Sequence, residues 1–266
     1  MRILLTNDDG INAPGLAALR GAMGDLGETV VVAPDMERSG VAHSVTLAQP
    51  LRIRKVYHGD TFYGYAINGV PADCVKLACS EILEAPPDLL LSGINLGMNA
   101  AINVIYSGTV AAAIEGAMLD VPSVAFSLAE TEKPDFEEAA QVARQLLDRL
   151  LDDGLPQQAL LNVNIPGRPW RRLRGIRVTH QSRTGYKDFY EKRVDPWGRT
   201  YYWITGQLQH DYEDEPDSDL RALHEGYVSV TPLQYDMTSH SAVPDLRRRM
   251  AAEWGTPEAE ARAADS

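Results

Sequence analysis

The chain has 266 residues, of which 44% are hydrophobic and 23% charged, and its formal net charge is −12. This composition is typical of a globular protein and excludes a largely disordered chain. The acidic balance argues against a dedicated nucleic-acid binder, because such proteins hold phosphates with basic patches.

Short apolar strands alternate with longer helical patterns through the first two-thirds of the chain. The strands are apolar throughout, which is typical of a parallel sheet covered on both faces. We therefore predict an α/β fold, a Rossmann-like three-layer sandwich with a mostly parallel sheet. The expected strands are 2–6, 29–33, 51–56, 62–67, 88–91, 122–127 and 160–165, and the expected helices are 14–26, 71–83, 109–119 and 135–151.

The pattern changes after Pro166. Residues 168–199 carry ten Lys and Arg against three Asp and Glu, with aromatic residues between them and no helical periodicity. A projecting β-hairpin or arm fits this composition, and strands are expected at 201–205 and 227–230. The predicted division is a catalytic core over 1–166, a β-hairpin arm over 167–226, a C-terminal strand and extension over 227–252, and a disordered tail over 253–266.

Two features bear on the compartment. The only cysteines, Cys74 and Cys79, fit neither a CxxC redox pair nor a zinc site, so buried thiols in a reducing compartment are expected. The first residues lack the basic start of a signal peptide, and no apolar stretch reaches the roughly 18 residues of a membrane helix. We expect a cytoplasmic protein that has neither a membrane nor a nucleic-acid polymer as partner.

The most informative stretch is Leu-Leu-Thr-Asn-Asp-Asp-Gly at residues 4–10. Ligands of open parallel sheets bind at the carboxyl ends of the strands, and just past such an end Asp8 and Asp9 can converge in a turn eased by Gly10. Paired carboxylates repel unless a cation lies between them, and oxygen ligands suit Mg²⁺, Mn²⁺ or Ca²⁺. A metal site is the favoured interpretation, and an Asx-rich turn that caps the next helix is the alternative.

Three further polar loops are expected on the same edge of the sheet. Residues 38–44 follow the second strand, residues 91–99 supply Asn95 and Asn99, and residues 106–110 open a helix whose free N–H groups suit a phosphate. An ordinary N-cap at Ser107 or Thr109 is the alternative for the last loop. Together the loops predict a metal-assisted phosphate site. A metal-activated water is the simpler nucleophile, because no GxSxG elbow is evident and the pair Asp8 and Asp9 lacks the DxD spacing of phosphatases that form an aspartyl-phosphate.

The same residues resemble the SurE (survival protein E) family of metal-dependent nucleotidases, from Met1 to about Ser241. Any single matching stretch is weak, but the ordered set is specific. In chain order the matches cover residues 6–10, 39–44, 69–76, 92–95, 106–109, 162–166, 195–198 and 236–241.

The resemblance implies a function and a set of site residues. The implied reaction is that of a 5′-nucleotidase, in which nucleoside 5′- and 3′-monophosphates, and in some members short polyphosphate, are hydrolysed through a metal-activated water. One divalent metal ion per subunit, Mg²⁺ or Mn²⁺, is implied at Asp8, Asp9, Ser39 and Asn95. Catalytic roles are implied for Asp8, Asp9, Asn99 and Ser107, and phosphate contacts for Asn95, Asn99, Ser107, Gly108 and Thr109. A homodimer or homotetramer is also implied, with the 167–226 arm used for assembly and C-terminal segments of 227–252 exchanged.

One stretch departs from the family pattern. Residues 100–103 are Ala-Ala-Ile-Asn, where members usually have Leu-Gly, a variable residue and Asp. Without the glycine and the acid we expect a change in loop shape or metal affinity, with activity retained because the four ligand positions are intact. Asp8 or Asp9 is the candidate general base. His240 is interpreted as a structural residue in preference to a catalytic one, and for His43 both a role in supporting the site and a purely structural role are open.

Two alternative functions would require other features of the sequence. A nucleotide-dependent transferase would need a GxGxxG loop or a P-loop lysine after the first strand, and residues 7–14 contain neither. A non-enzymatic, stress-related nucleotide-binding or assembly protein would depend on the basic arm. That alternative leaves the convergence of Asp8, Asp9 and Asn95 unexplained.

Overall fold

The computed structural model describes residues 1–152, 154–155, 159–208 and 214–254. The chain divides into two units, Met1–Leu233 and Gln234–Ser266, and each is described by itself. Within the described ranges, none of the helices has the length and apolar character needed to cross a bilayer.

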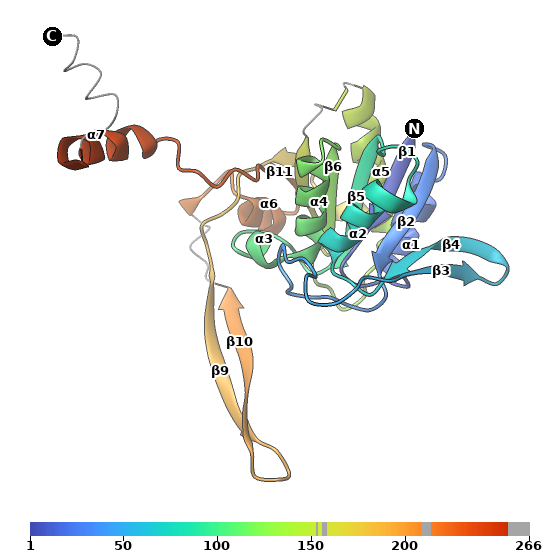
Figure 1. Ribbon diagram of the computed structural model, residues 1–266, viewed down its shortest axis with the longest axis horizontal. Helices are drawn as coiled ribbons and strands as arrows, with labels where there is room; N and C mark the ends of the chain where they lie inside the picture. The colour runs from blue at the N-terminus through green and yellow to red at the C-terminus, as the bar shows by residue number, and fades with distance from the viewer. Residues whose placement is uncertain (153, 156–158, 209–213, 255–266) are drawn as a thin grey trace. The chain divides into compact units, whose positions relative to one another are not determined.

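One large sheet forms the centre of the first unit (Figure 1). Among the described residues it has nine strands in the order β3-β4-β2-β1-β5-β6-β7-β11-β8. All neighbours from β4 to β7 are parallel, whereas β3 is antiparallel to β4 and β11 is antiparallel to β7. The strands are β1 (Arg2–Thr6), β2 (Glu28–Pro34), β3 (Ile53–His58), β4 (Thr61–Ile67), β5 (Leu89–Leu96), β6 (Ser123–Leu128), β7 (Leu160–Ile165), β8 (Ile176–Val178) and β11 (Val228–Pro232).

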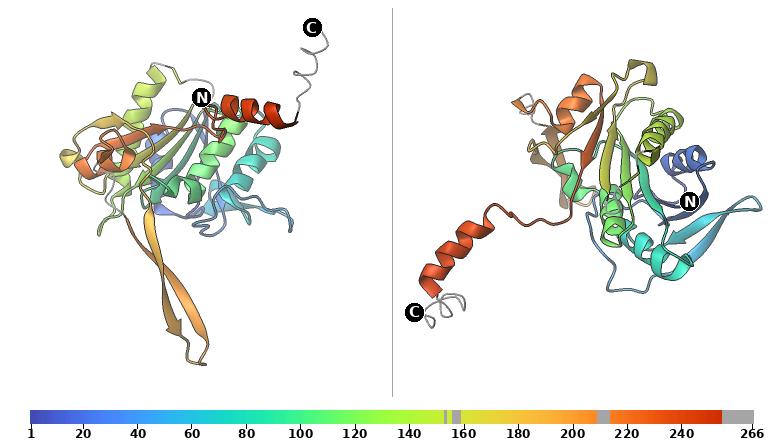
Figure 2. Two further views of the ribbon diagram at one scale, coloured as in Figure 1. Left: turned by 90° about the vertical axis from the view of Figure 1, so that its left-hand side faces the viewer. Right: turned by 90° about the horizontal axis from the view of Figure 1, so that it is seen from above.

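Helices cover both faces of this sheet, which confirms the predicted three-layer α/β fold (Figure 2). Helices α1 (Pro14–Met23) and α5 (Phe136–Asp152) pack on one face, and α2 (Pro71–Leu77) and α4 (Gly108–Met118) pack on the other. Alternate residues of β1 serve the two faces, so Ile3 and Leu5 join one hydrophobic core and Leu4 joins the second. Helix α2 is shorter than expected because the chain continues as a π-helical turn over Ala78–Ile82.

Strand β5 is longer than the sequence predicts. It continues past residue 91 to Leu96, so Ser92 and Asn95 lie within the strand and Ser92 is fully buried. The pairing with β6 is irregular between Ser92 and Asn95, where Gly93 has φ +132° and a Cβ atom would lie 2.3 Å from the carbonyl oxygen of Phe126. Only glycine fits this bend, and the bend brings Asn95 to the end of the strand.

The chain after residue 166 contributes to the sheet and also forms a separate hairpin. Strands β9 (Tyr186–Val194) and β10 (Thr200–Leu208) pair with each other in an antiparallel two-stranded sheet of their own, which confirms the predicted hairpin (Figure 1). Strands β8 and β11 instead extend the main sheet, with a short helix α6 (Asp219–Glu225) before β11. The sequence pattern does not predict α6. The boundaries at residues 166 and 226 stay predictions.

The second unit contains helix α7 (Val243–Trp254). Before this helix, His240 Nε2 lies 2.6 Å from Asp236 Oδ2, and the imidazole is largely exposed. Residues 253 and 254 complete α7, whereas residues 255–266 of the predicted tail lie outside the described residues.

Candidate functional site

A cleft of about 460 Å³ lies where β1, β2 and β5 end at the carboxyl edge of the sheet. The chain reaches this edge three times because parallel strands all end on the same side. Six residues predicted from the sequence line the cleft together, namely Asp8, Asp9, Ser39, Asn95, Asn99 and Ser107. The three polar loops expected to converge therefore do converge.

In the turn after β1, the structural role belongs to Asn7 and not to the two aspartates. The Asn7 side chain donates to the carbonyl oxygen of Gly10 (3.0 Å) and accepts from the Gly10 N–H (3.2 Å). Helix α1 begins after Ala13 without a side-chain cap. The Asx-turn role that was the alternative for this stretch thus falls to Asn7, and neither Asp8 nor Asp9 caps the helix.

The two aspartates lie beside each other and have a third acid, Glu37, as a neighbour. Burial raises the pKa of Asp8, although a hydrogen bond from the Thr109 hydroxyl opposes this rise. Burial, followed by the negative charges of Asp8 and Glu37, raises the pKa of Asp9 to about 6. No Lys, Arg or His is among the described residues that line the cleft. The site therefore holds excess negative charge that a bound cation would neutralise.

The donor set fits a hard divalent cation. The Asn95 side-chain amide donates to the Gly97 carbonyl oxygen at 2.8 Å, which leaves Oδ1 as its ligand atom. The Ser39 hydroxyl donates to Glu37 at 2.6 Å and keeps oxygen lone pairs for a metal. No three His, Cys, Asp or Glu side chains of the described ranges form a metal-binding group. A cation here would be held by two carboxylates and neutral oxygens, a set that suits Mg²⁺ or Mn²⁺.

Helix α4 begins beside the aspartates. Ser107 is its N-cap and accepts a hydrogen bond from the Val110 N–H (3.1 Å), so the capping interpretation holds for this residue, which also lines the cleft. A Cβ atom at Gly108 would lie 2.8 Å from the Asp8 Cβ, so only glycine allows the helix this close. Thr109 is fully buried against Asp8, and the cleft lining among described residues includes neither Gly108 nor Thr109. Their phosphate contacts stay predictions.

Among the residues that line the cleft, Glu37 lies outside the polar loops predicted from the sequence, and Asn103 was considered only as a departure from the family pattern. Glu37 follows β2 by three residues, and Tyr106 ends the short helix α3 (Asn103–Tyr106). Asn103 begins that helix and also lines the cleft. The position of Glu37 just past a strand at the same edge is the signal that could have identified it.

A buried carboxylate supports the loop that carries Ser39. Glu115 of α4 is only 2% exposed, and its two oxygens lie 2.8 Å from His43 Nε2 and 2.6 Å from Lys76 Nζ. The same loop donates a backbone hydrogen bond from Ala42 to Tyr106 (3.1 Å). His43 therefore ties the loop to α4, in agreement with a structural role.

Fold and site together define a Rossmann-like α/β protein with an acidic ligand site at the carboxyl edge of its sheet. The family model "Survival protein SurE" matches residues 3–188. The chain belongs to the SurE family.

Named relatives match almost the whole chain. The "5'-nucleotidase SurE" of Desulforudis audaxviator is 46% identical over 259 residues, which cover 96% of this chain and 99% of the relative. The protein of the same name from Chlorobaculum tepidum is 48% identical over 238 residues, or 90% of each chain. The crystal structure of the SurE protein from Aquifex aeolicus superposes with a TM-score of 0.81 at 43% identity, and the match covers 94% of this chain and 99% of that one.

Proposed function

We propose that this protein is a divalent-metal-dependent phosphomonoesterase that hydrolyses nucleoside 5′-monophosphates, and also 3′-monophosphates and short polyphosphate. The observation that carries the proposal is the adjacent pair of a buried Asp8 and a half-buried Asp9, in a cleft whose described lining has no basic residue. The name 5'-nucleotidase, which similar proteins bear, supports the substrate class.

The proposed mechanism divides the work between the metal ligands and the start of α4. Asp8, Asp9, Ser39 and Asn95 would hold one Mg²⁺ or Mn²⁺ ion. When bound, such an ion would supply a lower pKa for a water molecule and positive charge opposite the phosphoryl group. Ser107 and the N-terminus of the 11-residue helix α4 favour the negative charge of the phosphate.

Asn99 and Asp9 complete the proposed roles. The Asn99 side chain donates to Ser127 Oγ (2.8 Å), which fixes its orientation at the cleft wall for contact with substrate. Asp9 would accept the proton of the attacking water. Asp9 suits this role better than Asp8 because Thr109 already occupies one oxygen of Asp8.

We further propose that the protein works as a homodimer or homotetramer with exchanged C-terminal segments. The β9–β10 hairpin supports assembly because large apolar side chains remain exposed along it, and such surfaces in soluble proteins mark interaction sites. They include Phe189, Tyr190, Trp197, Tyr202, Trp203 and Ile204. Sedimentation equilibrium of the full chain tests this, and a monomer at micromolar concentration would refute it.

The function is tested by phosphate release from 5′-AMP, 5′-GMP, their 3′ isomers and tripolyphosphate, each with Mg²⁺, with Mn²⁺ and with EDTA. The proposal expects release with a divalent ion and none with EDTA. Folded protein that releases no phosphate under any condition would refute it. If such protein still bound nucleotide, the result would favour the non-enzymatic nucleotide-binding alternative.

A further inference from the structure

The backbone between β5 and α3 is held by side chains from distant parts of the chain. Asn99 donates its backbone N–H to Asn164 Oδ1 (2.8 Å), and its carbonyl oxygen accepts from Asn162 (2.7 Å) and Asn164 (3.1 Å). Both asparagines lie on β7 and are fully buried. Strand β7 thus fixes the position of Asn99 at the cleft wall.

Two residues further on, the chain takes a conformation that a non-glycine residue rarely adopts. Ala101 has φ +52°, at the position where the family pattern has glycine. Its N–H donates to Asp219 Oδ2 (2.9 Å), and its carbonyl oxygen accepts from Gln181 Nε2 (2.7 Å). These two side chains hold Ala101 in its left-handed conformation.

Asp219 is a fully buried carboxylate with three backbone donors. Besides Ala101, it accepts from the N–H of Ser182 (3.0 Å) and of Leu220 (2.8 Å). Ser182 lies four residues before β9, so one carboxylate joins the loop at the cleft to the base of the hairpin. The loop also packs against α6, because Ala100 and Ala101 share a small hydrophobic cluster with Leu220 and Leu223.

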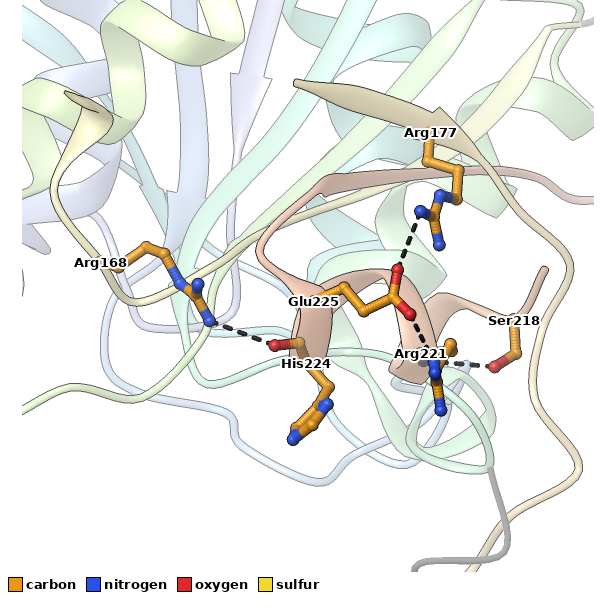
Figure 3. A network of polar contacts seen from close by, with 6 residues as sticks. All are labelled: Arg168, Arg177, Ser218, Arg221, His224 and Glu225. Carbon is orange, nitrogen blue, oxygen red and sulfur yellow. Dashed lines mark hydrogen bonds and ion pairs between the residues drawn. The ribbon is translucent and has the colours of Figure 1, made fainter. Parts of the chain in front are cut away.

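Helix α6, whose first residue is Asp219, is held by polar contacts at both ends (Figure 3). At the C-terminal end of the helix, Glu225 accepts from Arg177 of β8 (2.9 Å) and from Arg221 (2.6 Å). Arg168 donates to the carbonyl oxygen of His224 (3.3 Å). At the N-terminal end, Ser218 caps the helix by accepting from the Arg221 N–H (3.2 Å).

We propose that Asp219 is a positioning residue, which holds the loop over residues 99–102 in its active shape and ties it to the base of the hairpin. This rests on the proposed function of the cleft, since Asn99 begins that loop, Asn103 follows it, and both residues line the cleft. Asp219 itself does not touch the substrate. Its effect on turnover passes through the backbone of Ala101.

Asp219→Asn in the full chain tests the proposal, with Ser218→Ala as the matched control. Asparagine keeps the size of aspartate but replaces one carboxylate oxygen with an NH₂ group, which cannot accept a hydrogen bond. At least one of the three backbone N–H groups therefore loses its acceptor. We expect kcat for 5′-AMP to fall about 10- to 100-fold, with KM changed less than kcat. Ser218→Ala removes the cap of α6 but keeps the three hydrogen bonds of the Asp219 carboxylate, so it should lower Tm by about 2–6 °C and change kcat far less than Asp219→Asn does.

Two further variants keep the test decisive. Ala101→Gly in the Asp219→Asn background should recover part of the lost kcat, because glycine adopts φ +52° without strain. If Asp219→Asn does not fold, Gln181→Ala loosens the same loop from the other side and should lower kcat about 3- to 10-fold. Equal kcat in Asp219→Asn and Ser218→Ala, or unchanged kcat in Gln181→Ala when it is the variant used, would overturn the proposal.

Amide hydrogen exchange at Ala101 and Ser182 separates this proposal from the proposed function. Asp219→Asn should speed exchange at both amides relative to Ser218→Ala, whether or not the wild-type protein hydrolyses nucleotides. Unchanged exchange at Ala101 would refute the positioning role. A wild-type protein without phosphatase activity would refute the proposed function instead.

Discussion

The Thr109 hydroxyl of α4 donates a hydrogen bond to the carboxylate of Asp8. Both side chains are buried, with Thr109 fully buried and Asp8 5% exposed. The bond joins the start of the predicted phosphate-binding helix to the predicted metal ligand, and it opposes the rise that burial causes in the pKa of Asp8.

Thr109→Val should weaken this arrangement without changing its shape. Valine is similar in size but leaves a buried carboxylate oxygen without its donor, so we expect about 1–3 kcal/mol less stability in metal-free protein at pH 7. Urea unfolding measures this difference. Thr109→Ser keeps the hydroxyl and should retain most of the stability, so equal losses in the two variants would contradict the role given to the hydrogen bond.

The raised pKa of Asp9, about 6, makes stability depend on pH and metal. A carboxyl group whose pKa is higher in the folded than in the unfolded protein favours folding when protonated, so this contribution is present below pH 3.8 and is lost as the pH rises through about 6. Because solvent reaches Asp9, Asp9→Asn should raise metal-free stability by only about 1 kcal/mol at pH 7.5, and by less at pH 4.5. Urea unfolding at the two pH values provides the test, and a variant less stable than wild type at pH 7.5 would disagree.

For Glu115 we predict the opposite dependence of stability on pH. Burial alone would raise its pKa, but the hydrogen bonds from His43 and Lys76 outweigh burial and bring the pKa below 4.5. The stability it gives is therefore present above pH 4.5 and is lost as the pH falls through the folded-state pKa. Glu115→Gln should destabilise the protein by about 1–3 kcal/mol at pH 7, with a smaller loss near pH 4. A loss that is constant with pH would argue against the ion pairs.

Asn103 offers a test of this chain's departure from the family pattern. It lines the cleft with Asp8, Asp9 and Glu37, so Asn103→Asp adds a further negative charge there. We expect Mn²⁺ to bind about 3- to 10-fold more tightly, as measured by calorimetric titration in the absence of substrate. Weaker or unchanged Mn²⁺ binding would mean that this position lies outside the electrostatic reach of the cation.

Much of the site could be predicted from the sequence because strand order and local motifs carry it. Two aspartates come just after the end of β1, and Asn95 and Asn99 lie at and just beyond the end of β5. Their polar groups therefore meet at one edge of a parallel sheet. The extension of β5 through Asn95 was not predicted, since Ser92 and Gly93 look like loop residues. Pairing of Ser92 with both β1 and β6, and of Asn95 with β6, keeps this segment in the strand.

The supporting contacts were beyond sequence reasoning. Asp219 lies in an acidic stretch of the sequence, yet it is fully buried and three backbone N–H groups donate to its carboxylate. Its partner Ala101 is 118 residues away in the chain. Such a contact depends on the whole fold, and neither composition nor periodicity reports it.

The central claim is that Asp8 and Asp9 hold a divalent ion that drives phosphate-ester hydrolysis. The most direct measurement is the steady-state rate of phosphate release from 5′-AMP by the wild-type protein and by Asp9→Asn, each with Mn²⁺ and with EDTA. We predict release by the wild-type protein with Mn²⁺. With EDTA, or in Asp9→Asn, the rate should fall by a factor of about 100 or more. An Asp9→Asn variant as active as wild type, or wild-type activity unaffected by EDTA, would contradict the account.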